Sequence, residues 1–173
     1  MLPGTDPRLR KEYLVIGAHY DHVGVGMSGS RTPGRRGEIH NGADDNASGT
    51  SALLELIEAF AKVPQKRSIL FLAFDAEEKG LLGSKAWTKK PTRPLQRIIA
   101  MINLDMVGRS KDGYLFIGGV NTGRGFEKMI RRANEPFGFN LELHGGGNAP
   151  SDNASFYRKK VPVLFFFTAE HNE

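Results

Sequence analysis

The feature that most constrains the fold of this chain is a set of short segments that are apolar at every position. They lie at residues 13–16, 69–74, 98–102 and 163–167. A strand with one face in water alternates apolar and polar side chains, whereas a strand covered on both faces is apolar throughout. The segments therefore predict buried strands of a mostly parallel sheet. A further run at residues 114–117 predicts a strand nearer the sheet edge.

Helical patterns separate these strands. In residues 53–60 apolar side chains recur every three or four positions, and residues 126–130 repeat this spacing. A third helix is expected to run through Phe156, with Ser151 or Asp152 as its N-cap. The alternation of strands and helices predicts an α/β fold: a three-layer sandwich in which helices flank a mostly parallel central sheet.

The composition fits one compact domain spanning residues 1–173. Of the 173 residues, 39% are hydrophobic, which is enough to form a buried core. The sequence contains no cysteine, which excludes disulfide bonds, thiolate zinc sites and a cysteine nucleophile within it. Any metal ion must therefore be bound through oxygen and imidazole nitrogen.

The net charge of +5 raises the question of a nucleic-acid partner. The basic residues are scattered in small groups, such as Arg35 with Arg36 and Lys89 with Lys90, and form no stripe interleaved with aromatics. We therefore expect no nucleic-acid partner. No apolar stretch approaches the roughly 20 residues that a membrane helix needs, so no membrane partner is expected. Residues 1–11 are polar and lack the apolar segment of a secretory signal.

Histidine and carboxylate side chains follow the predicted strands, where the ligands of open α/β sheets bind. In chain order these residues are His19 and Asp21, Glu77 and Glu78, Asp105, and finally Glu170 and His171. The segment 42–49 adds Asp44 and Asp45 directly before a helix. So many acids at one edge would repel each other without a cation. The pattern therefore predicts a metal site.

The kinds of side chain at this edge indicate which metal binds. Histidine with carboxylates and no sulfur favours zinc, manganese or cobalt, and zinc is the usual choice for hydrolysis. The spacing of His19 and Asp21 fits a ligand histidine whose other ring nitrogen is held by an acid. Since consecutive side chains point different ways, one of Glu77 and Glu78 can bind metal while the other stays free as a base.

Each of these elements has a simpler explanation on its own. Two adjacent aspartates are usually a turn or a helix N-cap, and Glu77 with Glu78 fits a solvated helix start, where acids suit the dipole. A lone His-x-Asp pattern is more often structural than metal-binding. Their joint occurrence, each after a strand, is what favours the metal site.

Four ordered blocks carry a resemblance to a known family. They are Gly17-Ala18-His19-Tyr20-Asp21, Gly42-Ala43-Asp44-Asp45-Asn46-Ala47-Ser48-Gly49, Ala76-Glu77-Glu78-Lys79-Gly80-Leu81-Leu82-Gly83-Ser84 and Asn103-Leu104-Asp105-Met106. Together they resemble the co-catalytic di-zinc aminopeptidases, which include bacterial leucyl aminopeptidases. That group is related to glutamate carboxypeptidase, the transferrin receptor and glutaminyl cyclase. The resemblance covers nearly the whole chain.

The resemblance implies a role for each residue. His19 and Asp105 would bind one zinc ion, Glu78 the other, and Asp44 would bridge the two. Glu77 would be the general base and Asp21 would orient His19. The family often has a cis peptide bond between the residues that match Asp44 and Asp45. The implied activity is removal of N-terminal residues from peptide substrates that have a free N-terminus.

The sequence departs from the family pattern at both ends and at one internal position. Relatives carry a histidine ligand of the second zinc after the last strand, and this chain has His171 there, at the spacing of an earlier, non-ligand histidine. The second zinc site is thus expected to be incomplete, with His171 as the substitute candidate. Strands and a helix before residue 1 and a segment after residue 173 are expected to be missing. Relatives also often have histidine in place of Asn153.

Two other functions remain open at this stage. A single-zinc acyltransferase of the glutaminyl cyclase type would use the same fold, and a catalytically inactive domain would keep the fold for binding. The glycine-bearing loop 24–42 lies between two of the metal-site blocks and is a candidate substrate loop.

Overall fold

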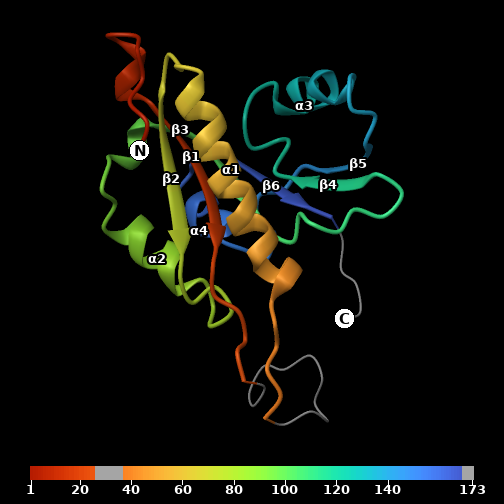
Figure 1. The fold of residues 1–173 in the computed structure, drawn as a ribbon. Coiled ribbons are helices and arrows are strands. Elements are labelled where there is room, and N and C mark those ends of the chain that lie inside the picture. Colours follow the sequence, from red (N-terminus) through yellow and green to blue (C-terminus); the bar gives the residue numbers. More distant parts are fainter. Residues whose placement is uncertain (26–36, 169–173) are drawn as a thin grey trace.

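A computed structural model describes residues 1–25 and 37–168. Within them lies one six-stranded sheet with the spatial order β2-β1-β3-β6-β4-β5 (Figure 1). The strands are β1 (Tyr13–His19), β2 (Ser68–Phe74), β3 (Ile98–Leu104), β4 (Tyr114–Gly118), β5 (Asn140–His144) and β6 (Val163–Phe167).

The sheet is mixed but mostly parallel, as the sequence predicts. Strand β1 pairs in parallel with β2 and β3, and β3 pairs in parallel with β6. Strand β4 runs antiparallel to β6, and β5 runs parallel to β4. Consequently β1, β2, β3 and β6 all end at the same edge, and this edge receives the side chains that follow them.

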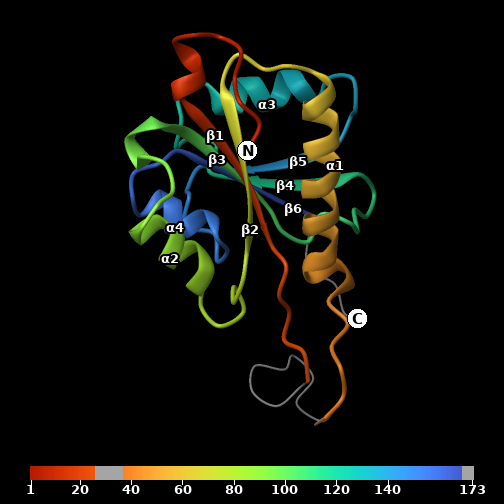
Figure 2. The same ribbon diagram turned by 60° about the vertical axis from the view of Figure 1, so that its left-hand side comes forward.

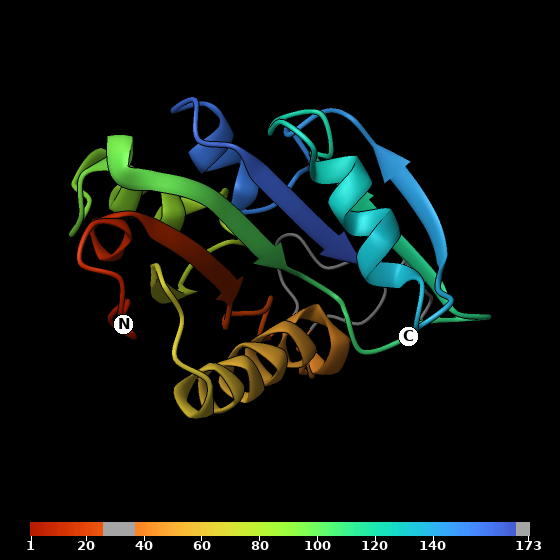
Figure 3. The same ribbon diagram turned by 90° about the horizontal axis from the view of Figure 1, so that it is seen from above.

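Helices cover both faces of the sheet and give the predicted three layers. Helices α1 (Gly49–Lys62) and α3 (Phe126–Asn134) lie on one face, and α2 (Leu82–Lys89) and α4 (Asn153–Tyr157) lie on the other (Figures 2 and 3). Three short helical turns complete the described elements: η1 (Leu9–Lys11), η2 (Ala43–Ser48) and η3 (Leu95–Arg97). None of the helices in residues 1–25 and 37–168 is both long and apolar enough to cross a membrane.

The core consists of layers on either side of the sheet. Consecutive residues of β1 point to opposite faces, so Val15 packs with Phe156 of α4 and Ile16 packs with Leu53 of α1. Both β1 residues are buried, which is why the segment reads as apolar throughout. Residues 163–165 of β6 are buried in the same way, whereas residues 71–73 of β2 and Ile99 of β3 are partly exposed.

Several sequence predictions were incomplete. Strand β5 was missed because its burial alternates along an exposed edge, and helix α2 was missed because it is short. The expected capping of α4 was wrong: no side chain caps this helix, and the hydroxyl of Ser151 donates to Asp105 instead. Met129, expected on the apolar face of α3, is 51% exposed.

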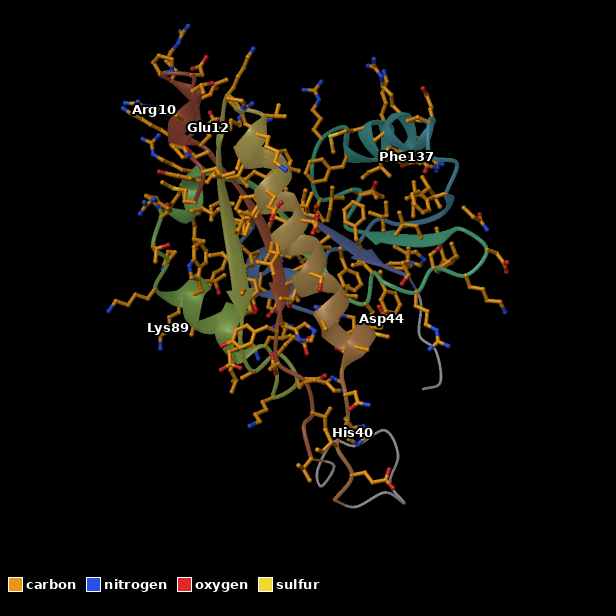
Figure 4. All side chains as sticks on the ribbon, in the orientation of Figure 1. Arg10, Glu12, His40, Asp44, Lys89 and Phe137 are labelled. Carbon is orange, nitrogen blue, oxygen red and sulfur yellow. The ribbon has the colours of Figure 1, made fainter. Side chains whose placement is uncertain are left out.

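Replacement of Phe156 by alanine should strongly destabilise the fold. The ring is fully buried and lies between Trp87 and Phe74, at centroid distances of 5.4 and 6.0 Å. Removing a buried phenylalanine side chain typically costs about 3–5 kcal/mol. Phe137→Ala is the matched control, because that ring is 75% exposed (Figure 4). Denaturant unfolding measures both, and equal losses would contradict the assigned core.

Candidate metal centre

The strand ends gather two groups of potential metal ligands. One group is His19, Glu77 and Asp105, and the other is His22, Asp45 and Glu78. In each group one ligand atom per residue lies within 4.8 Å of the others. The residues come from the ends of β1, β2 and β3 and from the turn η2 before α1, at the lower end of the sheet in Figure 1. All donors are oxygen or imidazole nitrogen, a set that suits zinc.

His19 is held in the orientation that a metal ligand requires. It is the last residue of β1 and only 1% exposed. Its Nδ1 donates to the backbone carbonyl of Asp21 at 3.0 Å, so Nε2 is the nitrogen that is left to face the carboxylates. Nε2 faces Oδ1 of Asp105 and Oδ1 of Asp45, each at 3.4 Å. Metal-binding histidines usually have one ring nitrogen fixed in this way.

Asp21 connects His19 to the paired glutamates. Its carbonyl accepts from His19, and its carboxylate lies 3.5 Å from the same Nδ1. The two carboxylate oxygens accept hydrogen bonds from the backbone amides of Glu77, at 3.0 Å, and Glu78, at 3.3 Å. One side chain thus fixes the loop after β2 relative to the end of β1. The backbone carbonyl of Asp21, not its carboxylate, accepts from the ring of His19, so the orienting role of the Asp21 side chain stays a prediction.

Asp105 follows β3 and is held by a polar chain from the opposite side. Its Oδ2 accepts from the hydroxyl of Ser151 at 2.7 Å. The Ser151 oxygen in turn accepts from Nδ2 of Asn103, also at 2.7 Å. These bonds leave Oδ1 of Asp105 directed toward His19. The hydroxyl of Ser151 is therefore used to hold Asp105, which explains why it does not cap α4.

The turn η2 is tied to the end of β3 by Asn46. This buried side chain donates to the carbonyl of Leu104 and accepts from the amides of Gly49 and Met106. The backbone leaves the helical conformation at Asp45 and Asn46. Asp45 is thereby turned into the site, with Oδ1 at 3.4 Å from His19 and Oδ2 at 3.8 Å from His22. Its two oxygens thus face the two groups.

The assignment of the bridging position to Asp44 requires correction. Oδ1 of Asp44 accepts the amide of Gly108 at 2.8 Å, and Ser48 donates to its carbonyl. Asp44 belongs to neither ligand group among the described residues, and lies in η2, just before α1 (Figure 4). The cis peptide bond is also one residue further on, between Asp45 and Asn46. The structure places Asp45, not Asp44, between the two groups.

The adjacent glutamates are separated as the sequence suggests. Glu77 lies with His19 and Asp105, and Glu78 lies with His22 and Asp45. Oε1 of Glu78 is 2.8 Å from Nδ1 of His22. The two carboxylates therefore face different parts of the site.

The pKa values show how much negative charge is crowded together. Burial raises the pKa of Glu77 to about 8, opposed by His19 and increased by Asp105. Burial and the carboxylates of Glu78 and Asp105 raise the pKa of Asp45 to about 6. Burial alone would lower the pKa of His19, but Asp105, Glu77 and Asp45 raise it to about 10. Every shift favours added positive charge, which a bound cation supplies.

Sequence reasoning missed two residues near this site and named one that cannot be placed. His22 follows Asp21 directly, so a second histidine in the same block was the available signal. Asp152 is completely buried, burial raises its pKa to about 6, and neither of its oxygens accepts a hydrogen bond from the described residues. His171 lies outside the described residues, so its role as a substitute ligand stays a prediction.

An α/β sheet that gathers histidines and carboxylates at one edge, without sulfur, is typical of metal-dependent hydrolases. The chain matches Peptidase family M28 over residues 1–173 and belongs to this family. Aminopeptidase YwaD of Bacillus subtilis is 36% identical over 163 residues, which cover 90% of this chain and 32% of YwaD. The chain thus spans only about a third of that relative.

Solved structures agree with this membership. A zinc aminopeptidase from Bacillus subtilis superimposes with a TM-score of 0.73 at 30% identity, covering 100% of this chain and 40% of that one. Glutaminyl cyclase of Porphyromonas gingivalis superimposes with a TM-score of 0.77 at 22% identity, covering 94% of this chain and 61% of that one. At 22% identity, the likeness to the glutaminyl cyclase shows only that the two proteins share a fold.

The metal-free protein should lose stability as the pH rises. Glu77, with its pKa raised from 4.5 to about 8, and Asp45, raised from 3.8 to about 6, take up protons more readily when folded. Their stabilising contribution is complete below the ordinary pKa and is lost as the pH passes the raised value. The contribution of His19, raised from 6.5 to about 10, is lost over that higher range. All three effects have the same sign.

The melting temperature without metal should therefore be higher near pH 5 than near pH 8, and zinc should remove much of the difference. Glu77→Gln should flatten the pH dependence, whereas Glu55→Gln, on the exposed face of α1, should not. A melting temperature that rises over this interval in metal-free protein would contradict the charge crowding described above.

Proposed function

We propose that this chain carries the metal-dependent catalytic centre of a zinc aminopeptidase, which removes N-terminal residues from peptides. The observation that carries the proposal is the pair of adjoining ligand groups with Asp45 between them. Membership of Peptidase family M28 and the likeness to aminopeptidases support it. Because one sheet positions all six residues, we infer that residues 1–173 act as a single catalytic domain.

The side chains suited to hold zinc divide between the groups. His19 and Asp105 suit one ion, Glu78 suits a second, and Asp45 replaces Asp44 as the residue shared by both. Zinc at such a site supplies Lewis-acid chemistry: it lowers the pKa of water from about 15.7 toward about 7 and polarises a substrate carbonyl.

Glu77 is the proposed proton carrier. Its carboxylate lies in the His19 group, while its backbone amide is anchored by Asp21, so the side chain is directed into the site. Glu77 would take a proton from the attacking water and pass it to the departing amine.

The preference for a free N-terminus follows from charge. Carboxylate charge at this edge that bound zinc does not neutralise would attract a substrate ammonium group; the carboxylates there are those of Glu77, Glu78, Asp45 and Asp105. An internal peptide bond offers no such charge near the carbonyl that is cleaved. The fold similarity to a glutaminyl cyclase does not separate aminopeptidase activity from glutaminyl cyclase activity. A peptide with an N-terminal glutamine should therefore be tested in the same assay.

Glu77→Gln should lower the rate of leucyl-anilide hydrolysis by about 10²–10⁴-fold, the usual contribution of general acid–base catalysis. The amide cannot accept the proton but keeps nearly the same shape. Zinc content, measured by mass spectrometry on the same sample, should be unchanged. Glu55→Gln on α1 controls for loss of an unrelated charge. Unchanged turnover in Glu77→Gln would exclude the assigned role.

Asp45→Asn and Asp44→Asn separate the two neighbouring aspartates. Asp45→Asn should weaken zinc binding at both positions, because the amide replaces a charged oxygen facing His19 and one facing His22. Asp44→Asn keeps an oxygen that can accept from Gly108 and should leave zinc binding nearly intact. Titration of metal-free protein with zinc measures both. The opposite ranking would restore Asp44 as the shared residue.

A further inference from the structure

Basic residues that are scattered along the sequence gather at one end of the folded sheet. Strands β1, β2, β3 and β6 run in parallel, so the segments that lead into them meet at the edge opposite the metal centre. These segments are residues 6–12, 63–67, 91–97 and 158–162. Their basic residues, which we call the basic edge, are Arg8, Arg10, Lys11, Lys66, Arg67, Arg93, Arg97, Arg158, Lys159 and Lys160.

The strand register brings these segments side by side. Tyr13, the first residue of β1, pairs with Ser68 of β2 and with Ile98 of β3, and neighbouring strands lie about 4.8 Å apart. The carbonyl of Arg10 accepts from the hydroxyl of Ser68 at 2.7 Å, and the guanidinium of Arg93 lies 6.0 Å from the centre of the Tyr13 ring. The segment before β6 is bonded to the backbone of β3.

Carboxylates neutralise little of this charge. The acids of the four segments are Asp6 and Glu12. Glu12 pairs with Arg67 at 2.7 Å, and Asp6 accepts from the backbone amides of Arg8 and Leu9. Most of the basic side chains are exposed. The carboxylates of the metal centre lie at the other end of the sheet, so the net charge of +5 conceals a separation of charge along the strands.

The other side chains at this end favour a lipid surface over nucleic acid. The four segments contain no aromatic residue that could stack on a base and no α-helix that could enter a groove. Apolar side chains are exposed among the cations: Val63 is 58% exposed, and Ile99, directly after the start of β3, is 39% exposed. Lysine and arginine with a few exposed apolar side chains are typical of surfaces that lie on an anionic bilayer.

We propose that the basic edge binds the headgroups of an anionic phospholipid surface, with the metal centre facing away from it. Lipid phosphates attract the basic edge and repel the carboxylates at the other end of the sheet, so the charge separation orients the protein. The expectation of no membrane partner came from the lack of a long apolar stretch and concerns spanning helices alone. The inference goes beyond the proposed function and does not rest on it.

Vesicle co-sedimentation tests the inference. The protein should bind vesicles made of equal parts phosphatidylcholine and phosphatidylglycerol, and should not bind vesicles of phosphatidylcholine alone. Binding should weaken as the salt concentration rises, because salt screens exposed charges. Equal binding to both kinds of vesicle, or binding that salt does not change, would overturn the proposal.

Two matched lysine pairs locate the surface. Lys159→Gln with Lys160→Gln should weaken binding to the anionic vesicles by about 25-fold, since each basic residue near such a surface contributes about fivefold. Lys89→Gln with Lys90→Gln is the control: both lysines are exposed, the charge removed is the same, and Lys89 lies far from Arg10 in Figure 4. Equal weakening by the two pairs would show an effect of net charge alone and would overturn the assignment to the basic edge.

Duplex DNA at the same phosphate concentration decides between the two kinds of polyanion. Tighter binding to the DNA than to the anionic vesicles would overturn the lipid assignment, and weaker binding would support it. None of these assays measures hydrolysis. A protein that binds the vesicles but hydrolyses no leucyl-anilide would therefore keep the basic edge and lose the aminopeptidase function, and the opposite result would do the reverse.

Discussion

Repulsion between crowded carboxylates is the constraint on which the arrangement at the sheet edge depends. Asp45, Glu77 and Asp105 come from three different segments and converge on the buried His19, where solvent screens them only in part. The raised pKa values of Asp45 and Glu77 record the cost of this convergence in the absence of a cation. Such a cluster does not arise from core packing, which would exclude charge. It is understandable only as a site prepared for positive charge, whether a proton or a metal ion.

The scaffold maintains this unfavourable cluster through hydrogen bonds that leave the inward-facing ligand atoms free. Asp21 holds the loop after β2 by two backbone amides, and Asn46 holds the turn η2 to the end of β3 by three bonds. Ser151 fixes only one oxygen of Asp105. In each case the partner orients a ligand and leaves one lone pair directed inward. These hydrogen bonds within the protein hold the ligands in place, which limits the reorganisation that binding an ion requires.

The sequence predicts those parts of the structure in which local pattern and final environment agree. The apolar segments within β1, β2, β3 and β6 predict strands correctly, and the side chains after β1, β2 and β3 meet as the parallel topology requires. The choice between Asp44 and Asp45 could not be made in this way, because it depends on non-helical backbone angles at Asp45 and Asn46. His22 was missed for a related reason: only tertiary folding brings it to Glu78. Strand β5 has a weak pattern because it lies at an exposed edge.

The position of the loop base links the metal centre to its surroundings. His22 and Gly42 stand where the two arms of the 24–42 loop leave the sheet edge, and their contact is too close for any side chain at position 42. Movement of either arm at its base must therefore move the imidazole relative to Glu78.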